Sequence, residues 1–176
     1  MPIFTVLLAI VLMTAVSPNH AVEADALIHA PAFDSARNVW INSEPLDWET
    51  LRGKVVLLNI WTYGCGNCKR SIPWLKSVYS RYGERGLQIV GVHSPEFAWE
   101  KPRQAVAAAV EHHGIAWPVM LDNGLGYWTA LGNRYWPAFY IVDKQGRVAG
   151  YFFGETHAFD GRARTMERLI EKLLVD

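Results

Sequence analysis

The chain of 176 residues has few of the features that mark a disulfide scaffold or a highly charged binding protein. It contains only two cysteines, too few for a fold held together by disulfides. Its 17 basic and 17 acidic residues cancel, and this zero net charge argues against a nucleic-acid-binding surface. Because 51% of the residues are apolar and long charge runs are absent, we expect one globular domain with a full core.

The N-terminal segment has no basic residue, since the first Lys or Arg of the chain is Arg37. Its apolar run, 3–16, is shorter than the roughly 20 residues of a membrane-spanning helix. Ala24 and Ala26 follow with the A-x-A spacing of a signal-peptidase site. We therefore predict that residues 1–26 are a signal peptide or an uncleaved N-terminal anchor, unless the run is apolar by chance. Residues 27–176 would then form a periplasmic or secreted domain.

The remaining sequence alternates between strand and helix patterns. Residues 55–61 are an almost unbroken apolar run rich in β-branched and aromatic side chains, which predicts a strand buried on both faces. The other expected strands lie near 40–46 and at 87–93, 118–121, 138–142 and 148–153, with helices at 67–82, 102–113, 125–131 and 161–175. Turn residues at 143–147 predict a hairpin between the last two strands. The pattern therefore predicts an α/β protein with a mixed sheet.

The two cysteines, Cys65 and Cys68, lie where the buried strand ends and the next helix begins. The free N–H groups and the positive dipole end of a helix N-terminus stabilise a thiolate and lower the pKa of a cysteine there. Cys68 follows one turn later, within reach of a disulfide. The spacing predicts a redox pair in which Cys65 is the nucleophile and Cys68 the resolving thiol.

Two other interpretations of this pair are a structural disulfide and a metal site. A disulfide that closes a four-residue loop stabilises a protein by only about 2 kcal/mol, and a domain of this size does not need it. A zinc site would require two further ligands, and the sequence has no second Cys-x-x-Cys and no His-x-x-x-His. The redox interpretation is therefore favoured, and it implies neither a metal nor an organic cofactor.

Residues 53–61, the cysteine pair and Pro73 resemble the thioredoxin fold in its extracytoplasmic TlpA/ResA-type form. Within that group, residues 61–63 and 92–97 look most like the C-terminal thioredoxin-like domain of DipZ proteins. The resemblance covers about residues 38–176. It implies a mixed central β-sheet flanked by helices, with an N-terminal hairpin and a central helix–strand insert within 96–120.

The resemblance also implies a peptide-binding position at Trp136 and Pro137. In the family a cis-proline faces the disulfide, and the backbone of the preceding residue pairs with the substrate peptide. We expect Pro137 to be this proline and Trp136 to be the residue that pairs. Trp61 is expected to join Trp136 in an apolar surface beside the cysteines.

The sequence departs from the family at the positions of its usual acidic residues. These positions hold Asn59 and Ser71, and neither side chain accepts a proton at neutral pH. Glu96 follows the expected strand 87–93, whose carboxyl end should lie at the active-site edge of the sheet. We therefore predict Glu96 as the substitute acid–base residue.

The sequence-based hypothesis is an extracytoplasmic thiol–disulfide oxidoreductase that reduces protein disulfides. The resemblance implies that a membrane electron carrier of the DsbD/CcdA kind returns the electrons. Three alternatives remain: a disulfide-forming oxidase, a thiol peroxidase and a non-catalytic peptide-binding module. The peroxidase alternative rests on Thr62, three residues before Cys65, where such enzymes carry a threonine.

Overall fold

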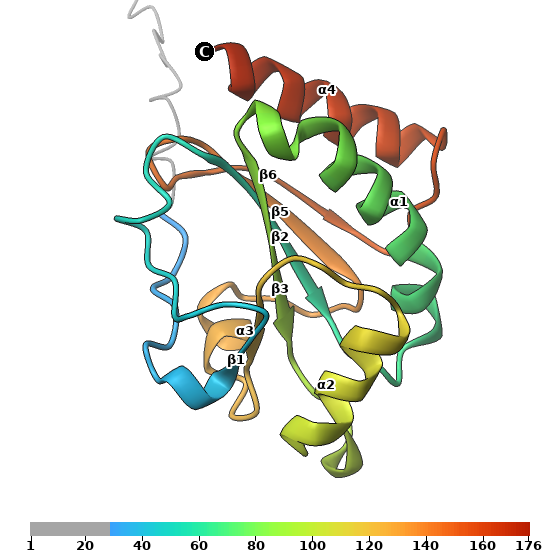
Figure 1. The fold of residues 1–176 in the computed structure, drawn as a ribbon. Helices are drawn as coiled ribbons and strands as arrows, with labels where there is room; N and C mark the ends of the chain where they lie inside the picture. The colour runs from blue at the N-terminus through green and yellow to red at the C-terminus, as the bar shows by residue number, and fades with distance from the viewer. Residues whose placement is uncertain (1–28) are drawn as a thin grey trace, which may run out of the picture.

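The computed structural model describes residues 29–176, which form a six-stranded sheet with helices on both faces (Figure 1). The strands are β1 (Trp40–Ile41), β2 (Val55–Trp61), β3 (Leu87–His93), β4 (Val119–Leu121), β5 (Ala138–Val142) and β6 (Val148–Phe153). The α-helices are α1 (Gly66–Tyr82), α2 (Arg103–His112), α3 (Gly126–Ala130) and α4 (Gly161–Val175), with 3-10 turns η1 (Arg37–Val39), η2 (Gly83–Arg85) and η3 (Ala98–Glu100). The predicted signal peptide or anchor lies outside the described residues. Within them, every helix is too short or too polar to cross a membrane.

The sheet is mixed, as the sequence predicts. Its order is β1-β4-β3-β2-β5-β6, with β2, β3 and β4 parallel and the other neighbouring pairs antiparallel. All seven residues of β2 are buried because helices or loops cover both faces of this central strand. The carboxyl ends of β2 and β3 lie at the same edge of the sheet, so the residues that follow them are brought together.

Two apolar clusters lie on opposite faces of the sheet. Helices α1, α2 and α4 cover one face, and α3 with the segment before β2 covers the other (Figure 1). Alternate residues of β2 divide between the clusters, with Leu57 and Trp61 on the α1 face and Leu58 and Ile60 on the α3 face. The side chain of Trp61 therefore points beneath α1.

The expected central insert is present, as η3, α2 and β4 between β3 and α3. The N-terminal hairpin differs from the expectation. Within residues 29–176 this region contains one two-residue strand, β1, which pairs with β4 rather than with an N-terminal neighbour. Asn42 has a left-handed backbone (φ 66°), and its side-chain amide donates to the carbonyls of Ile115 and Trp117. The chain therefore turns away from the sheet before a second strand can form.

Candidate active site

Cys65 and Cys68 form a disulfide at the N-terminus of α1, with their Cα atoms 5.3 Å apart. Cys65 is the N-cap residue, and its Sγ accepts a hydrogen bond from the backbone N–H of Cys68 at 3.1 Å. The same N–H can stabilise the Cys65 thiolate once the disulfide is reduced. Cys65 is half-buried, whereas Cys68 is 2% exposed. Only the first sulfur is therefore positioned for an incoming partner.

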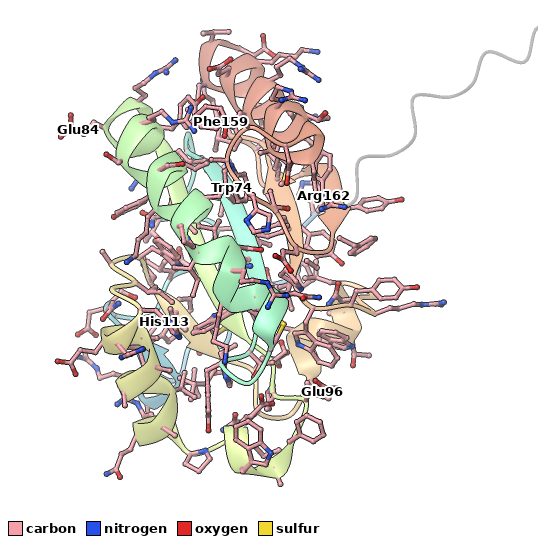
Figure 2. The ribbon with its side chains drawn as sticks, turned by 90° about the vertical axis from the view of Figure 1, so that its right-hand side faces the viewer. Trp74, Glu84, Glu96, His113, Phe159 and Arg162 are labelled. Carbon is pink, nitrogen blue, oxygen red and sulfur yellow. A yellow bond between two sulfur atoms is a disulfide. The ribbon has the colours of Figure 1, made fainter. Side chains whose placement is uncertain are left out.

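Cys65 opens onto a shallow pocket of about 470 Å³. The pocket is lined by Gly64, Cys65, Gly66, Asn67, Glu96, Arg134, Tyr135 and Trp136. Three of the residues that the sequence singles out, Cys65, Glu96 and Trp136, thus border one cavity. Glu96 is exposed at the same end of the molecule as the disulfide, far from Glu84 at the other end of α1 (Figure 2).

The peptide bond between Trp136 and Pro137 is cis, as the resemblance implies. Pro137 is buried and directly precedes β5, whose first residue is opposite Ile60 of β2. Trp136 is held by a 2.9 Å hydrogen bond from its Nε1 to the carbonyl of Ser94, and its ring lies 4.0 Å from that of Trp128. The indole is therefore fixed beside the Cys65 pocket.

Trp61 does not lie on the surface where the sequence analysis places it. Its side chain is 1% exposed and lies edge-on to the His93 ring at 5.4 Å. Two exposed aromatic residues lie near the cysteines instead: Tyr135, which lines the Cys65 pocket, and Trp99, which packs edge-on against Tyr63; each is 57% exposed. Sequence reasoning missed Trp99 because it lies in the short 3-10 turn η3, and a three-residue element has no periodicity from which exposure can be predicted.

His93 is a fully buried side chain below the active-site turn. Its Nε2 lies 3.2 Å from the hydroxyl of Thr62. Burial lowers the pKa of His93 to about 4, although the nearby charge of Glu100 acts in the opposite direction. The imidazole is therefore neutral at physiological pH. Because the Thr62 hydroxyl is fully buried and contacts His93, the structure gives no support to the peroxidase alternative.

The buried acid next to the active-site turn is Glu100, which the sequence analysis did not identify. Its Oε1 accepts from the N–H of Gly64 at 3.0 Å, and its Oε2 accepts from the N–H groups of Glu96 and Phe97 at 2.6 and 2.9 Å. The side chain is 0% exposed. Glu96, the predicted acid, thus contributes its backbone to this contact while its side chain lines the pocket.

Ser71 and Asn59, which occupy the family's acidic positions, have structural contacts. The hydroxyl of Ser71 donates to the carbonyl of Asn67 at 2.9 Å and accepts from the N–H of Thr156 at 3.0 Å. Asn59 is 4% exposed in the middle of β2. Neither position therefore supplies an ionisable group to the cysteines.

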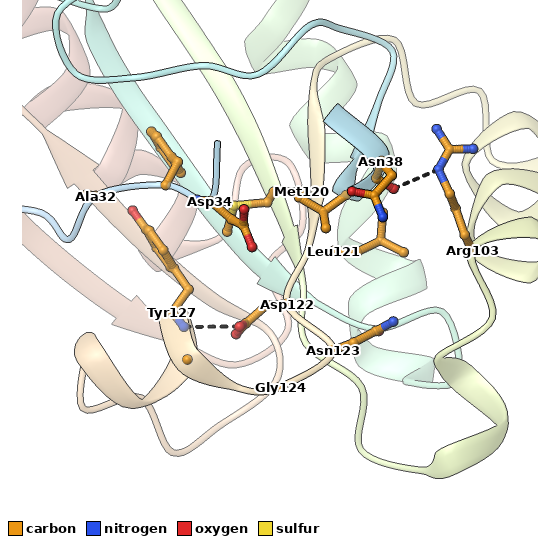
Figure 3. A pocket seen from close by; sticks show the side chains of 13 residues that line it. Ala32, Asp34, Asn38, Arg103, Met120, Leu121, Asp122, Asn123, Gly124 and Tyr127 are labelled. Atoms are coloured by element: carbon orange, nitrogen blue, oxygen red, sulfur yellow. Dashed lines mark hydrogen bonds between the residues drawn. The ribbon is translucent and has the colours of Figure 1, made fainter. Parts of the chain in front are cut away.

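A larger cavity of about 620 Å³ lies on the α3 side of the sheet and contains no cysteine (Figure 3). Its charged side chains already have partners. Arg103 donates to the carbonyls of Asn38 and Trp40, and Asp122 accepts from the N–H groups that begin α3. The candidate active site is therefore the smaller pocket, which Cys65 lines.

A thioredoxin-like fold with a half-buried cysteine at a helix N-terminus, a buried second cysteine and a cis-proline directly before β5 is characteristic of thiol–disulfide oxidoreductases. The family model described as Redoxin matches residues 29–167. The chain belongs to the Redoxin family.

Two relatives show how the chain compares with known proteins. Protein DipZ of Mycobacterium tuberculosis is 43% identical over 140 residues, which cover 78% of this chain and 19% of DipZ. The thiol-disulfide oxidoreductase ResA of Halalkalibacterium halodurans is 30% identical over 108 residues, covering 61% of this chain and 58% of ResA. The matched segment is thus about a fifth of the length of DipZ, so the activity of the whole DipZ protein is not carried over.

Solved structures support the fold. A thioredoxin-like superfamily protein superposes with a TM-score of 0.74 at 24% identity, covering 84% of this chain and 97% of that structure. A thiol-disulfide isomerase from Corynebacterium glutamicum superposes with a TM-score of 0.70, also at 24% identity and with the same coverage. At this level of identity the likeness concerns the arrangement of strands and helices.

Proposed function

We propose that this protein reduces disulfides in extracytoplasmic proteins, with Cys65 as the attacking thiolate and Cys68 as the resolving thiol. The observation that carries the proposal is the unequal exposure of the two sulfurs at one helix N-terminus. Cys65 borders an open pocket, and Cys68 is 2% exposed beneath it. An incoming disulfide can reach the first sulfur, and the second can reach only the first.

The reaction transfers two electrons from the protein to its substrate. The Cys65 thiolate attacks one sulfur of the substrate disulfide, which forms a mixed disulfide and releases the other substrate sulfur as a thiolate. The Cys68 thiolate then attacks the Cys65 sulfur and releases the second substrate thiol. The protein is left with the Cys65–Cys68 disulfide, and the substrate gains both electrons with two protons from solvent.

The pocket beside Cys65 suits an extended peptide. The backbone at Trp136, before cis-Pro137, is proposed to pair with the substrate segment that carries the disulfide, as in the family that the sequence resembles. Trp136, which lines the pocket, and Trp99, which lies against Gly64, would contact apolar side chains of the peptide. Glu96, exposed in the same pocket, is proposed to exchange protons with the substrate thiols.

The protein must receive two electrons after each turnover. A membrane carrier of the DsbD/CcdA kind is proposed as the donor, since such carriers serve the extracytoplasmic proteins that this chain resembles. The apolar run 3–16 and the A-x-A spacing at Ala24 and Ala26 support export as a periplasmic or secreted protein, or tethering by an uncleaved segment.

The direction of electron flow is tested by the reduction potential of the cysteine pair. The purified protein is equilibrated in glutathione or dithiothreitol buffers, and the reduced fraction is read from tryptophan fluorescence. We expect a potential near that of thioredoxin, about −270 mV. A potential near that of DsbA, about −120 mV, would overturn the reductase proposal in favour of an oxidase.

A further inference from the structure

The contacts of Glu100 stabilise the active-site turn and also place its carboxylate close to the reactive cysteine. We propose that Glu100 is a positioning residue that fixes the turn before Cys65, and that its buried negative charge opposes ionisation of the Cys65 thiol and so keeps the pair reducing. This inference rests on the proposed reductase function.

The carboxylate of Glu100 joins two segments that are far apart in the sequence. One oxygen accepts from Gly64, the residue before Cys65, and the other accepts from the two residues that lead into η3. A Cβ atom added to Gly64 would lie only 2.0 Å from Oε1 of Glu100. The carboxylate therefore fits against the bare backbone at this glycine, one residue from the reactive sulfur.

The contacts of Glu100 suit a carboxylate. Three N–H donors surround its two oxygens, and a carboxylate accepts hydrogen bonds without donating any. None of the five ion pairs formed within residues 29–176 includes Glu100. The nearby His93 is neutral, because burial lowers its pKa to about 4. The charge is thus stabilised by backbone dipoles alone and is not cancelled by a cation.

Other charged groups near Cys65 are more exposed to solvent. Glu96 and Arg134 carry opposite charges, and both are exposed residues that line the pocket. On α1, Lys69 is exposed, and Arg70 forms an ion pair with Glu155. Salt and water screen such groups more strongly than a fully buried charge. Glu100 is therefore the charge near the cysteine that solvent screens least.

A negative charge close to a thiol disfavours the thiolate, which opposes the effect of the helix N-terminus. Reduction of the disulfide is less favourable when the thiolate of the reduced form is less stable. DsbA is the opposite case, because its stabilised reduced form makes it a strong oxidant. The Glu100 carboxylate thus shifts the Cys65–Cys68 pair towards giving up electrons.

The test compares Glu100→Gln and Glu100→Asp with the unmodified protein. Cys65 ionisation is followed by thiolate absorbance against pH, and the redox equilibrium with glutathione by alkylation and mass spectrometry. In Glu100→Gln we expect the Cys65 thiol to ionise about one pH unit lower. The redox equilibrium with glutathione should shift about tenfold towards the reduced protein, which corresponds to about +30 mV. Glu100→Asp keeps the charge and should remain within about threefold of the unmodified protein.

Asp143→Asn is the matched control. Asp143 is also a buried carboxylate that accepts backbone N–H bonds, but it lies in the turn between β5 and β6. This variant should lose stability without moving either redox readout. The proposal is overturned if Glu100→Gln leaves both the Cys65 ionisation and the glutathione equilibrium within twofold of the unmodified protein. It is also overturned if Cys65 of this variant ionises at a higher pH. In either case Glu100 would act through geometry alone.

Two further measurements keep the test decisive. If Glu100→Gln does not fold, the carboxyl carbon of Glu100 in the reduced unmodified protein is followed by NMR, and its signal should move over the pH range in which Cys65 ionises. An unchanged signal would overturn the proposal. A potential near that of DsbA for the unmodified protein would refute the reductase function, whereas the difference made by Glu100→Gln would still measure the carboxylate's effect.

Discussion

The buried His93 makes the stability of the fold depend on pH. Its pKa is lowered from an ordinary 6.5 to about 4, mainly by burial, so the unfolded chain binds a proton between these values and the folded protein does not. The free energy of unfolding therefore falls as the pH drops from about 6.5 towards 4. The slope is about 1.4 kcal/mol per pH unit for one proton, so the loss between pH 7 and pH 5 is about 2 kcal/mol.

The assay is urea unfolding of the oxidised protein at several pH values between 7 and 5, compared with His93→Gln. The glutamine has no proton to gain and retains an amide that can pair with the hydroxyl of Thr62. We expect the variant to be less stable at pH 7 and to lose about 2 kcal/mol less between pH 7 and pH 5 than the unmodified protein.

His113→Gln is the control, because burial also lowers the pKa of His113, but less than that of His93. It should remove a smaller part of the pH dependence. If the unfolding free energies of the unmodified protein and His93→Gln run parallel between pH 7 and pH 5, the reasoning is refuted. An imidazole signal of His93 that titrates near 6.5 in the folded protein would contradict it as well.

Two further predictions concern the stability of the site and of the last helix. Gly64→Ala places a methyl group 2.0 Å from Oε1 of Glu100 and should cost about 1–3 kcal/mol through the lost buried hydrogen bond, whereas Gly124→Ala, with open space around its Cβ, should cost far less. Equal urea midpoints for the two variants would be inconsistent with this packing. Asp160→Ala removes the N-cap of α4, where the carboxylate accepts from the N–H of Ala163 at 2.7 Å, and should cost about 1 kcal/mol in the same assay. An unchanged midpoint would show that the cap contributes nothing.

Much of the fold could be predicted from local patterns. The apolar run 55–61 indicates a strand covered on both faces, and the structure places it at the centre of the sheet. Turn residues indicate the hairpin between β5 and β6, where Gly146 has a positive φ of 84° and Asp143 accepts from neighbouring N–H groups. The pairing of β1 with β4 could not be predicted, because two residues carry too little pattern to specify a distant partner.

The site was predictable where its chemistry depends on spacing along the chain. Cys65 and Cys68 are three residues apart, and the structure places them at the helix N-terminus that the sequence indicates. Trp61 was misplaced because its exposure depends on which face of β2 the helix α1 covers. Glu100 was missed because three backbone N–H groups from two segments surround its carboxylate. A local sequence pattern does not predict a contact between distant segments.

Trapping the mixed disulfide shows whether Cys65 attacks the substrate and Cys68 resolves the intermediate. The variants Cys68→Ser and Cys65→Ser are reduced, freed of reductant, mixed with a peptide that carries one disulfide, quenched with acid and analysed by mass spectrometry. We expect Cys68→Ser to accumulate a peptide adduct on Cys65, because the resolving thiol is missing, and Cys65→Ser to form almost none, because Cys68 is 2% exposed. Equal adducts in both variants, or an adduct on Cys68 alone, would refute the assignment of Cys65 as the attacking thiolate.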